Sequence, residues 1–208
     1  MPTATPHTTG SHNRNPRFGI TFTRTAILLP TPRVYATAST RTFEGEIPLP
    51  IIDEGKKAPL FTLTDQHGKM HALKDFLGKP VVVYFYPKDD TSGCTAQACD
   101  FRDNLARFKR AKCAVLGVSP QDVKSKSKFA AKHELTFPIL ADEGSKVCEK
   151  YGVWAEKSMY GRKYMGVVRT TYLIDAKGKV AKRWDKVKTT DHAEDVLSAV
   201  KALHAAAK

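Results

Sequence analysis

A run of six residues at 81–86, VVVYFY, constrains the fold of this chain more than any other feature. All six side chains are β-branched or aromatic, and an uncharged run of this kind is typical of a strand that is buried on both faces. A second such run, CAVLGVS, follows at 113–119. Two doubly buried strands need a sheet that is covered on both sides, so we expect an α/β domain.

The residues between and after these runs predict helices and further strands. Cys94, Ala98, Phe101, Leu105 and Phe108 recur at helical spacing and form one apolar stripe. The other predicted elements are a hairpin at 61–73 that turns at 67–68, helices at 122–133, 145–151 and from 191 onward, a short strand at 137–140, and a hairpin made by 170–175 and 180–185. This order indicates a central mixed β-sheet with helices on both faces and an N-terminal β-hairpin.

The first 43 residues differ in composition from the rest of the chain. They hold thirteen Ser or Thr, five Pro and five Arg, with no Lys, Asp or Glu. This composition resembles an organelle transit peptide, although an inert disordered tail or a misassigned start site would account for it equally. We expect a disordered leader at 1–46 and one globular domain at 47–208. A transit peptide would place the protein in a plastid or the mitochondrial matrix, whereas a bacterial protein of this kind would be cytoplasmic.

The net charge of +13 raises the question of a nucleic-acid partner. The first 43 residues contribute +5 of it, and elsewhere Lys is interleaved with Asp and Glu along the predicted helices, which is typical of a solvated basic surface. No nucleic-acid-binding module is recognisable, so no nucleic acid is expected as a partner. No stretch reaches the roughly 18 uninterrupted apolar residues of a membrane-spanning helix, so no membrane is expected either.

The loop between the run 81–86 and the next helix carries the candidate site, in the sequence YPKDDTSGCTAQAC at 86–99. In an open α/β sheet, chemistry usually lies on the loops at the carboxyl ends of strands. Gly93 is expected to let the chain turn tightly, which places Cys94 in the first turn of the helix. Free backbone N–H groups and the helix dipole favour the nucleophilic thiolate there. Alternatively, Cys94 is a small buried hydrophobe on the apolar stripe, and periodicity alone does not separate the two.

Cys99 follows five residues later on the same predicted helix. At 100° per residue the two side chains point about 140° apart, and the helix rises about 7.5 Å between them. This separation is too long for an unstrained disulfide, so the pair can bond only if the first turns unwind. The spacing also suits metal binding poorly, and no second Cys or His pair completes a tetrahedral set, so neither a metal nor another cofactor is predicted. Four Cys are too few for a disulfide scaffold, which favours catalytic or redox roles.

The segment PKDDTSGCTAQAC at 87–99 resembles the peroxiredoxin signature Pro-x-x-x-Thr-x-x-Cys. The second Cys, five residues on, is similar to the bacterioferritin comigratory protein (peroxiredoxin Q) branch of that family. Further family-like blocks occur in order over residues 55–205, among them APLFTLTDQHGK, VVVYFYPK, FPILADE, YGVWAEKSMYGRKYMG and VVRTTYLID. The resemblance implies a thioredoxin-like fold and thiol peroxidase activity. Ser92 departs from the pattern, since many members have Pro there; the change loosens the loop but removes no catalytic group.

The resemblance also implies roles for five residues, namely Cys94 as the peroxidatic Cys, Cys99 as the resolving Cys, and Pro87, Thr91 and Arg169 as the surrounding site. Cys94 would attack a peroxide and become a sulfenic acid, which Cys99 would capture as an intramolecular disulfide. Thioredoxin or a similar dithiol would reduce that disulfide, and a monomer would suffice for the cycle. Arg169 would hydrogen-bond the thiolate and the peroxide together, or simply be an ordinary surface Arg beside Val168. Thr91 would bond both as well, or simply cap the helix, and Pro87 would shield the pocket, or simply end the strand.

The remaining cysteines and aromatic residues have less specific expectations. Cys113 and Cys148 are expected to be core residues. Trp154 and Tyr160 belong to a segment that is expected to be a loop packed over the edge of the site. Two other functions stay open: a nucleic-acid-binding or chaperone-like protein on the same scaffold, and a protein disulfide oxidoreductase. The intact site residues argue against the first, and the lack of a Cys-x-x-Cys motif argues against the second.

Overall fold

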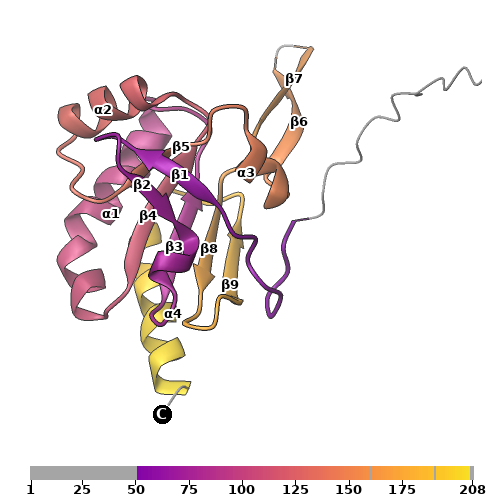
Figure 1. Ribbon diagram of the computed structural model, residues 1–208. Helices are drawn as coiled ribbons and strands as arrows, with labels where there is room; N and C mark the ends of the chain where they lie inside the picture. The colour runs from indigo at the N-terminus through magenta and orange to yellow at the C-terminus, as the bar shows by residue number, and fades with distance from the viewer. Residues whose placement is uncertain (1–50, 160, 190, 207–208) are drawn as a thin grey trace, which may run out of the picture. The chain divides into compact units, whose positions relative to one another are not determined.

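The computed structural model describes residues 51–206 except 160 and 190, so the leader predicted at 1–46 lies outside the described residues. Seven strands form one sheet in the order β2-β1-β5-β4-β3-β8-β9 (Figure 1). They are β1 (Thr62–Asp65), β2 (Met70–Ala72), β3 (Val81–Phe85), β4 (Ala114–Ser119), β5 (Ile139–Ala141), β8 (Thr170–Ile174) and β9 (Val180–Asp185). β3, β4 and β5 run parallel, whereas β1 and β8 pair antiparallel with their neighbours, so the predicted mixed sheet is confirmed.

β3 lies near the centre of this sheet, and all five of its side chains are buried. Val82 and Tyr84 point into one hydrophobic core, and Val81, Val83 and Phe85 point into a second core on the opposite face. Successive side chains of a strand face opposite sides, so an unbroken apolar run fits only where both sides are covered. The run VVVYFY therefore determines where the layers of the domain meet.

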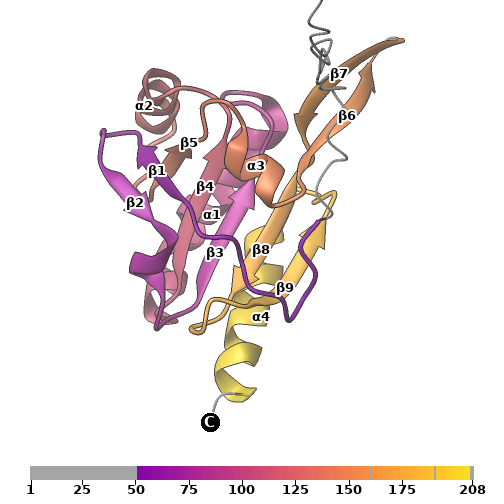
Figure 2. The ribbon, with the colours of Figure 1, turned by 45° about the vertical axis from the view of Figure 1, so that its right-hand side comes forward.

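In the part of the chain that the structure describes, four α-helices cover the two faces, namely α1 (Ser92–Arg110), α2 (Val123–Lys132), α3 (Lys146–Lys150) and α4 (His192–Ala206), with a short 3₁₀ helix η1 (Leu73–Phe76) after β2. Apolar residues of α1, α2 and α4 belong to the core that contains Tyr84, and those of α3 belong to the other core. Figure 2 shows α3 and α4 on opposite sides of the sheet. The predicted helices on both faces are confirmed.

The N-terminal hairpin predicted at 61–73 is also confirmed, with β1 antiparallel to β2. The Asp65 carboxylate fixes its turn, because Oδ1 accepts hydrogen bonds from the backbone N–H groups of His67 at 2.8 Å and Lys69 at 2.9 Å. Gly68 takes a φ of 80° in that turn, a conformation that glycine adopts without steric cost.

The segment before Arg169 forms a second hairpin, so the prediction of a loop there was wrong. β6 (Trp154–Met159) and β7 (Arg162–Val167) pair antiparallel in a two-stranded sheet of their own. Figure 2 shows this hairpin standing clear of the seven-stranded sheet. Trp154 packs against the core that contains Phe85, and Tyr160 lies outside the described residues.

Among the helices in the described ranges, none combines the length and apolar character that crossing a bilayer requires.

Candidate active site

Cys94 is the third residue of α1 and has 1% of its surface exposed. The first helical hydrogen bond in this turn runs from the N–H of Thr95 to the carbonyl of Thr91, at 2.8 Å. The N–H groups before Thr95, including that of Cys94, therefore precede the intrahelical ladder and point out of the helix end. The predicted placement of Cys94 in the first turn is confirmed.

Arg169 contacts Cys94 although it lies 75 positions further along the sequence. It follows β7 and precedes β8, and its Nη2 lies 3.1 Å from Cys94 Sγ. Its Nη1 donates a 2.6 Å hydrogen bond to the side-chain oxygen of Gln97, which is fully buried one turn further along α1. The guanidinium is thus fixed in orientation, because one nitrogen bonds Gln97 and the other contacts the thiol of Cys94.

The tight turn before α1 is made by Asp90 and not by Gly93, which corrects the expectation from sequence. Asp90 has a φ of 60°, in the left-handed region that Asp tolerates better than most residues. Gly93 lies inside the helix, and a Cβ built there would lie 3.5 Å from Arg169 Nη2. That distance is an ordinary van der Waals contact, so the guanidinium packs against the first turn of α1 at Gly93.

Thr91 is the N-cap residue of α1, but among the described residues its side chain makes no capping hydrogen bond. Its hydroxyl donates instead to the carbonyl of Lys88 at 3.2 Å and is on the exposed side of the loop. Pro87 is half-buried directly after β3, and its carbonyl accepts a hydrogen bond from Gln121 Nε2 at 3.3 Å. Both residues therefore border the loop that leads to Cys94, and neither is hydrogen-bonded to the thiol.

Cys99 lies on the same unbroken helix as Cys94, and both are free thiols. Cys94 is buried with Tyr84 and Phe101 in the core, whereas Cys99 is half-buried and belongs to neither core. The offset that the helical period predicts is confirmed: the two thiols face different surroundings in this conformation.

Two buried polar groups near Cys94 are absent from the sequence-based site. Tyr84 Oη and Gln97 Nε2 are buried, and neither has a hydrogen-bond partner within the described part of the chain. Burial raises the pKa of Tyr84, and negative charge on Cys94 raises it further, so the phenol stays neutral beside the thiol. The one signal in the sequence is a polar atom, the Tyr84 hydroxyl, within an otherwise apolar strand.

Sequence and structure both relate this chain to known proteins. The AhpC/TSA family matches residues 54–183. Peroxiredoxin Bcp of Escherichia coli is 48% identical over 147 residues, which cover 71% of this chain and 94% of the relative. A putative peroxiredoxin bcp of Coxiella burnetii is 47% identical over 146 residues, which cover 70% of this chain and 97% of the relative. The chain belongs to the AhpC/TSA family of peroxiredoxins.

Solved structures relate this peroxiredoxin to the peroxiredoxin Q branch of the family. The bacterioferritin comigratory protein of Xanthomonas campestris matches with a TM-score of 0.68 and 38% identity, covering 72% of this chain and 98% of that one. A PrxQ variant of Xylella fastidiosa matches with a TM-score of 0.70 and 34% identity, covering 74% and 98%. The thioredoxin-like fold and the peroxiredoxin Q branch, both expected from sequence, are confirmed, and the protein is an antioxidant thiol peroxidase.

The two other cysteines of this peroxiredoxin are buried, as predicted. Cys113 is 4% exposed, and burial raises the pKa of its thiol to about 12. Cys148 is fully buried, and burial together with the charge of Asp142 raises its pKa further still. Neither thiol ionises near neutral pH, so both are suited to packing rather than to nucleophilic chemistry.

Proposed function

We propose that this peroxiredoxin reduces hydrogen peroxide and organic hydroperoxides through Cys94 and Cys99 and that thioredoxin recycles it. The observation that supports this most directly is the 3.1 Å contact between Arg169 Nη2 and Cys94 Sγ. A guanidinium at hydrogen-bonding distance stabilises the thiolate over the thiol, and the helix end adds to the same effect. The thiolate is the form that attacks peroxide.

The first step cleaves the O–O bond. The Cys94 thiolate attacks one peroxide oxygen, an S–O bond forms, and the other oxygen leaves with a proton as water or an alcohol. Negative charge moves from sulfur to the leaving oxygen, so donors fixed near both atoms stabilise the transition state. In this proposal Arg169 donates from Nη2 to both atoms, and the hydrogen bond from Nη1 to Gln97 keeps the guanidinium in that orientation. In this proposal Thr91 bonds the peroxide and Pro87 shields the pocket.

The second step forms the disulfide. Cys99 attacks the sulfenic sulfur of Cys94, the S–S bond forms, and the sulfenic oxygen leaves as water. Because the two side chains point about 140° apart on an intact helix, the first turns of α1 must unwind for the bond to form. Thioredoxin or a similar dithiol then reduces the disulfide and restores both thiols.

Peroxide consumption by the Cys99→Ser variant tests these roles. Reduced wild-type protein should consume one equivalent of peroxide alone and many equivalents with reduced thioredoxin and its reductase. Cys99→Ser should consume the first equivalent at the wild-type rate and then stall, because its sulfenic acid has no intramolecular partner. Sustained thioredoxin-dependent turnover by Cys99→Ser would contradict the resolving role, and peptide mass mapping of oxidised wild type should find Cys94 joined to Cys99.

The intramolecular disulfide lets a monomer complete the cycle, so we propose a monomeric enzyme. We also propose that residues 1–46 direct it to a plastid or the mitochondrial matrix if they are a transit peptide; a bacterial enzyme would act in the cytoplasm. The acid-free, Arg-bearing composition of that segment supports targeting. A fluorescent protein fused behind residues 1–46 should enter an organelle if they are a transit peptide, and diffuse cytosolic fluorescence would contradict targeting.

A further inference from the structure

A buried ion pair lies behind the loop that leads to Cys94. The Lys126 side chain of α2 has no exposed surface, and the Asp89 side chain has 5%. Lys126 Nζ lies 2.9 Å from Asp89 Oδ1 and 3.0 Å from Oδ2, and it also donates to Ser119 Oγ. Burying two charges is unfavourable unless hydrogen bonds satisfy them. The peroxidase steps proposed above leave this pair without a role.

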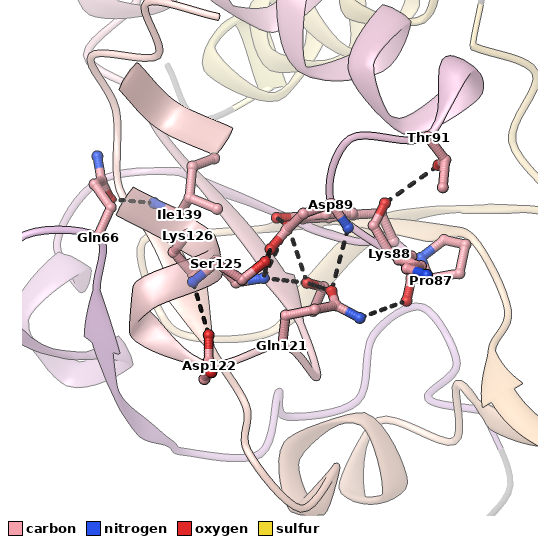
Figure 3. A network of polar contacts seen from close by, with 12 residues as sticks. Gln66, Pro87, Lys88, Asp89, Thr91, Gln121, Asp122, Ser125, Lys126 and Ile139 are labelled. Carbon is pink, nitrogen blue, oxygen red and sulfur yellow. Dashed lines mark hydrogen bonds and ion pairs between the residues drawn. The ribbon is translucent and has the colours of Figure 1, made fainter. Parts of the chain in front are cut away.

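The carboxylate of Asp89 is the centre of a wider network (Figure 3). It accepts 2.7 Å hydrogen bonds from the hydroxyls of Tyr86 and Ser125, in addition to those from Lys126. The ammonium of Lys126 also lies 5.2 Å from the centre of the Tyr86 ring, within the range of a cation–π contact. Burial lowers the pKa of Lys126, and the charge of Asp89 opposes that shift. Groups from the end of β3 and from α2 thus hold one carboxylate in place.

The same network also forms hydrogen bonds with the backbone of residues 87–89. The side-chain oxygen of Gln121 accepts a hydrogen bond from the N–H of Asp89 at 3.3 Å, and its nitrogen donates to the carbonyl of Pro87 at 3.3 Å. Ser119 Oγ holds Gln121 in turn, at 2.6 Å. The backbone is therefore fixed on either side of Lys88, the residue whose carbonyl accepts the hydrogen bond from Thr91.

The next residue is held in a different way. Asp90 pairs with Lys132 at 2.7 Å and with His133 at 2.9 Å, and 47% of the Asp90 side chain is exposed. An exposed ion pair such as the one with Lys132 contributes little to stability and separates easily. The chain passes from a buried attachment at Asp89 to an exposed one at Asp90 within a single peptide unit.

We propose that Asp89 and Lys126 form a clamp that positions Pro87 and Thr91 for peroxide and keeps residues 86–89 in place while the chain unwinds from Asp90 onward. Lys126 is a positioning residue, because it touches no reacting atom. The positioning part of the proposal concerns the reduced protein. The part about unwinding rests on the proposed Cys94–Cys99 disulfide.

Hydrogen exchange on the reduced and the oxidised wild-type protein tests the unwinding part. Residues 95–102 of α1 should lose protection on oxidation, because their helical hydrogen bonds break. The N–H of Asp89 and those of residues 81–86 should keep their protection in both forms. If the N–H of Asp89 loses protection together with α1, the clamp does not hold and this part is overturned.

The double variant Asp89→Ala with Lys126→Met tests the positioning part. Lys126→Met alone leaves a buried carboxylate unpaired and is expected to unfold, whereas the double variant removes both charges. In the reduced double variant, the single-turnover rate with peroxide should fall by about tenfold or more, because loop groups are misplaced. Alkylation of Cys94 by iodoacetamide, followed by peptide mass mapping, should stay within about twofold of wild type, because it needs only the thiolate.

Lys132→Met is the matched control, because it removes the exposed ion pair with Lys132 at the neighbouring Asp90 and leaves the contact with His133. For Lys132→Met, the single-turnover rate with peroxide and the rate of Cys94 alkylation by iodoacetamide should both stay within about twofold of wild type. A folded double variant that reacts with peroxide at the wild-type rate would overturn the clamp. Equal losses in the peroxide rate and the iodoacetamide rate would also overturn it, because they would indicate a general loosening of the structure around Cys94. Failure of wild type to consume peroxide would refute the proposed function alone. The clamp would then be judged by the protection of residue 89 in the reduced protein, which the double variant should lose.

Discussion

Cys94 in α1 and Cys148 in α3 occupy the same position in their helices and are equally inaccessible. Each is the third residue of its helix, and their exposed fractions are 1% and 0%. Their electrostatic surroundings are opposite. Cys94 faces the guanidinium of Arg169, whereas the charge of the Asp142 carboxylate raises the pKa of Cys148 beyond the effect of burial.

The two helix ends also differ in what occupies their N–H groups. In α3 the Asp142 carboxylate accepts hydrogen bonds from the N–H groups of Val147 at 3.0 Å and of Cys148 at 2.8 Å. In α1 the N-cap Thr91 turns its hydroxyl to Lys88 and leaves that end open. A helix N-terminus therefore favours a thiolate only where no carboxylate has already taken its N–H groups and its positive potential. Position and burial alone do not make a cysteine reactive.

The largest effect on peroxide turnover should come from replacing Cys94, and replacing Cys148 provides the comparison. Cys94→Ser should abolish peroxide turnover, because a hydroxyl is scarcely ionised at neutral pH. Cys148→Ala should keep a peroxide rate close to that of wild type, since its thiol stays protonated. Steady-state peroxidase assays with thioredoxin distinguish the two, and substantial activity in Cys94→Ser would remove Cys94 from its proposed role.

Replacing the cation that distinguishes the two sites should have the next largest effect. Arg169→Lys keeps the charge but loses the planar pair of donors that reach Gln97 and Cys94 together. The rate of reaction with peroxide should fall by more than about tenfold, since losing one transition-state donor commonly costs about 10²–10³ in rate. Stopped-flow kinetics measure it, and a wild-type rate would show that the two-point contact is not needed.

The buried thiol of Cys113 should make the unfolding free energy depend on pH. Burial raises the pKa of Cys113 to about 12, compared with about 8.5 in an unfolded chain. The resulting stabilisation is complete below the unfolded value and declines as the pH rises toward the folded one. Between about pH 8.5 and 10, wild type should lose up to about 2 kcal/mol more unfolding free energy than Cys113→Ala. Urea denaturation at the two pH values measures the difference, and parallel declines would contradict the burial argument.

The smallest effect should come from the leader. Residues 1–43 lack the periodicity and apolar content that packing on a core requires. Deleting them should leave the melting temperature and the peroxide rate nearly unchanged, as calorimetry and the peroxidase assay can establish. A clear drop in either quantity would mean that the leader contributes to the folded domain.

Local patterns were enough to predict most of the fold. The apolar run of β3 and the helical stripe of α1 each carry their own period, so their burial follows from sequence alone. The β6–β7 hairpin gave no such signal, because residues 162–165 of β7 are all exposed and burial begins only at the Trp154–Val167 end of the hairpin. Without a face to bury, a strand does not alternate apolar and polar residues.

The site was predictable as far as its motif extends. Cys94 and Arg169 followed from the family resemblance, but their 3.1 Å contact joins residues 75 positions apart, and no local period reports such a pairing. The same holds for Gln97, an ordinary helix residue in the sequence that the fold turns toward Arg169. The Asp89–Lys126 pair was hidden for a further reason: on periodicity, Lys126 is one of several lysines on a solvated helix face.

Gly117 of β4 shows how a position without a side chain can matter for the packing of the helix that carries Cys94. A Cβ at this position would lie 2.7 Å from Tyr84 Oη and 2.8 Å from Tyr84 Cζ. The Tyr84 ring stacks on Phe101 of α1 at 4.8 Å and cannot retreat without moving that helix. Any larger residue at 117 would therefore press the Tyr84 ring against Phe101 and so against α1, the helix that begins next to Cys94. The absence of a side chain at position 117 therefore bears on the helix that carries the reactive thiol.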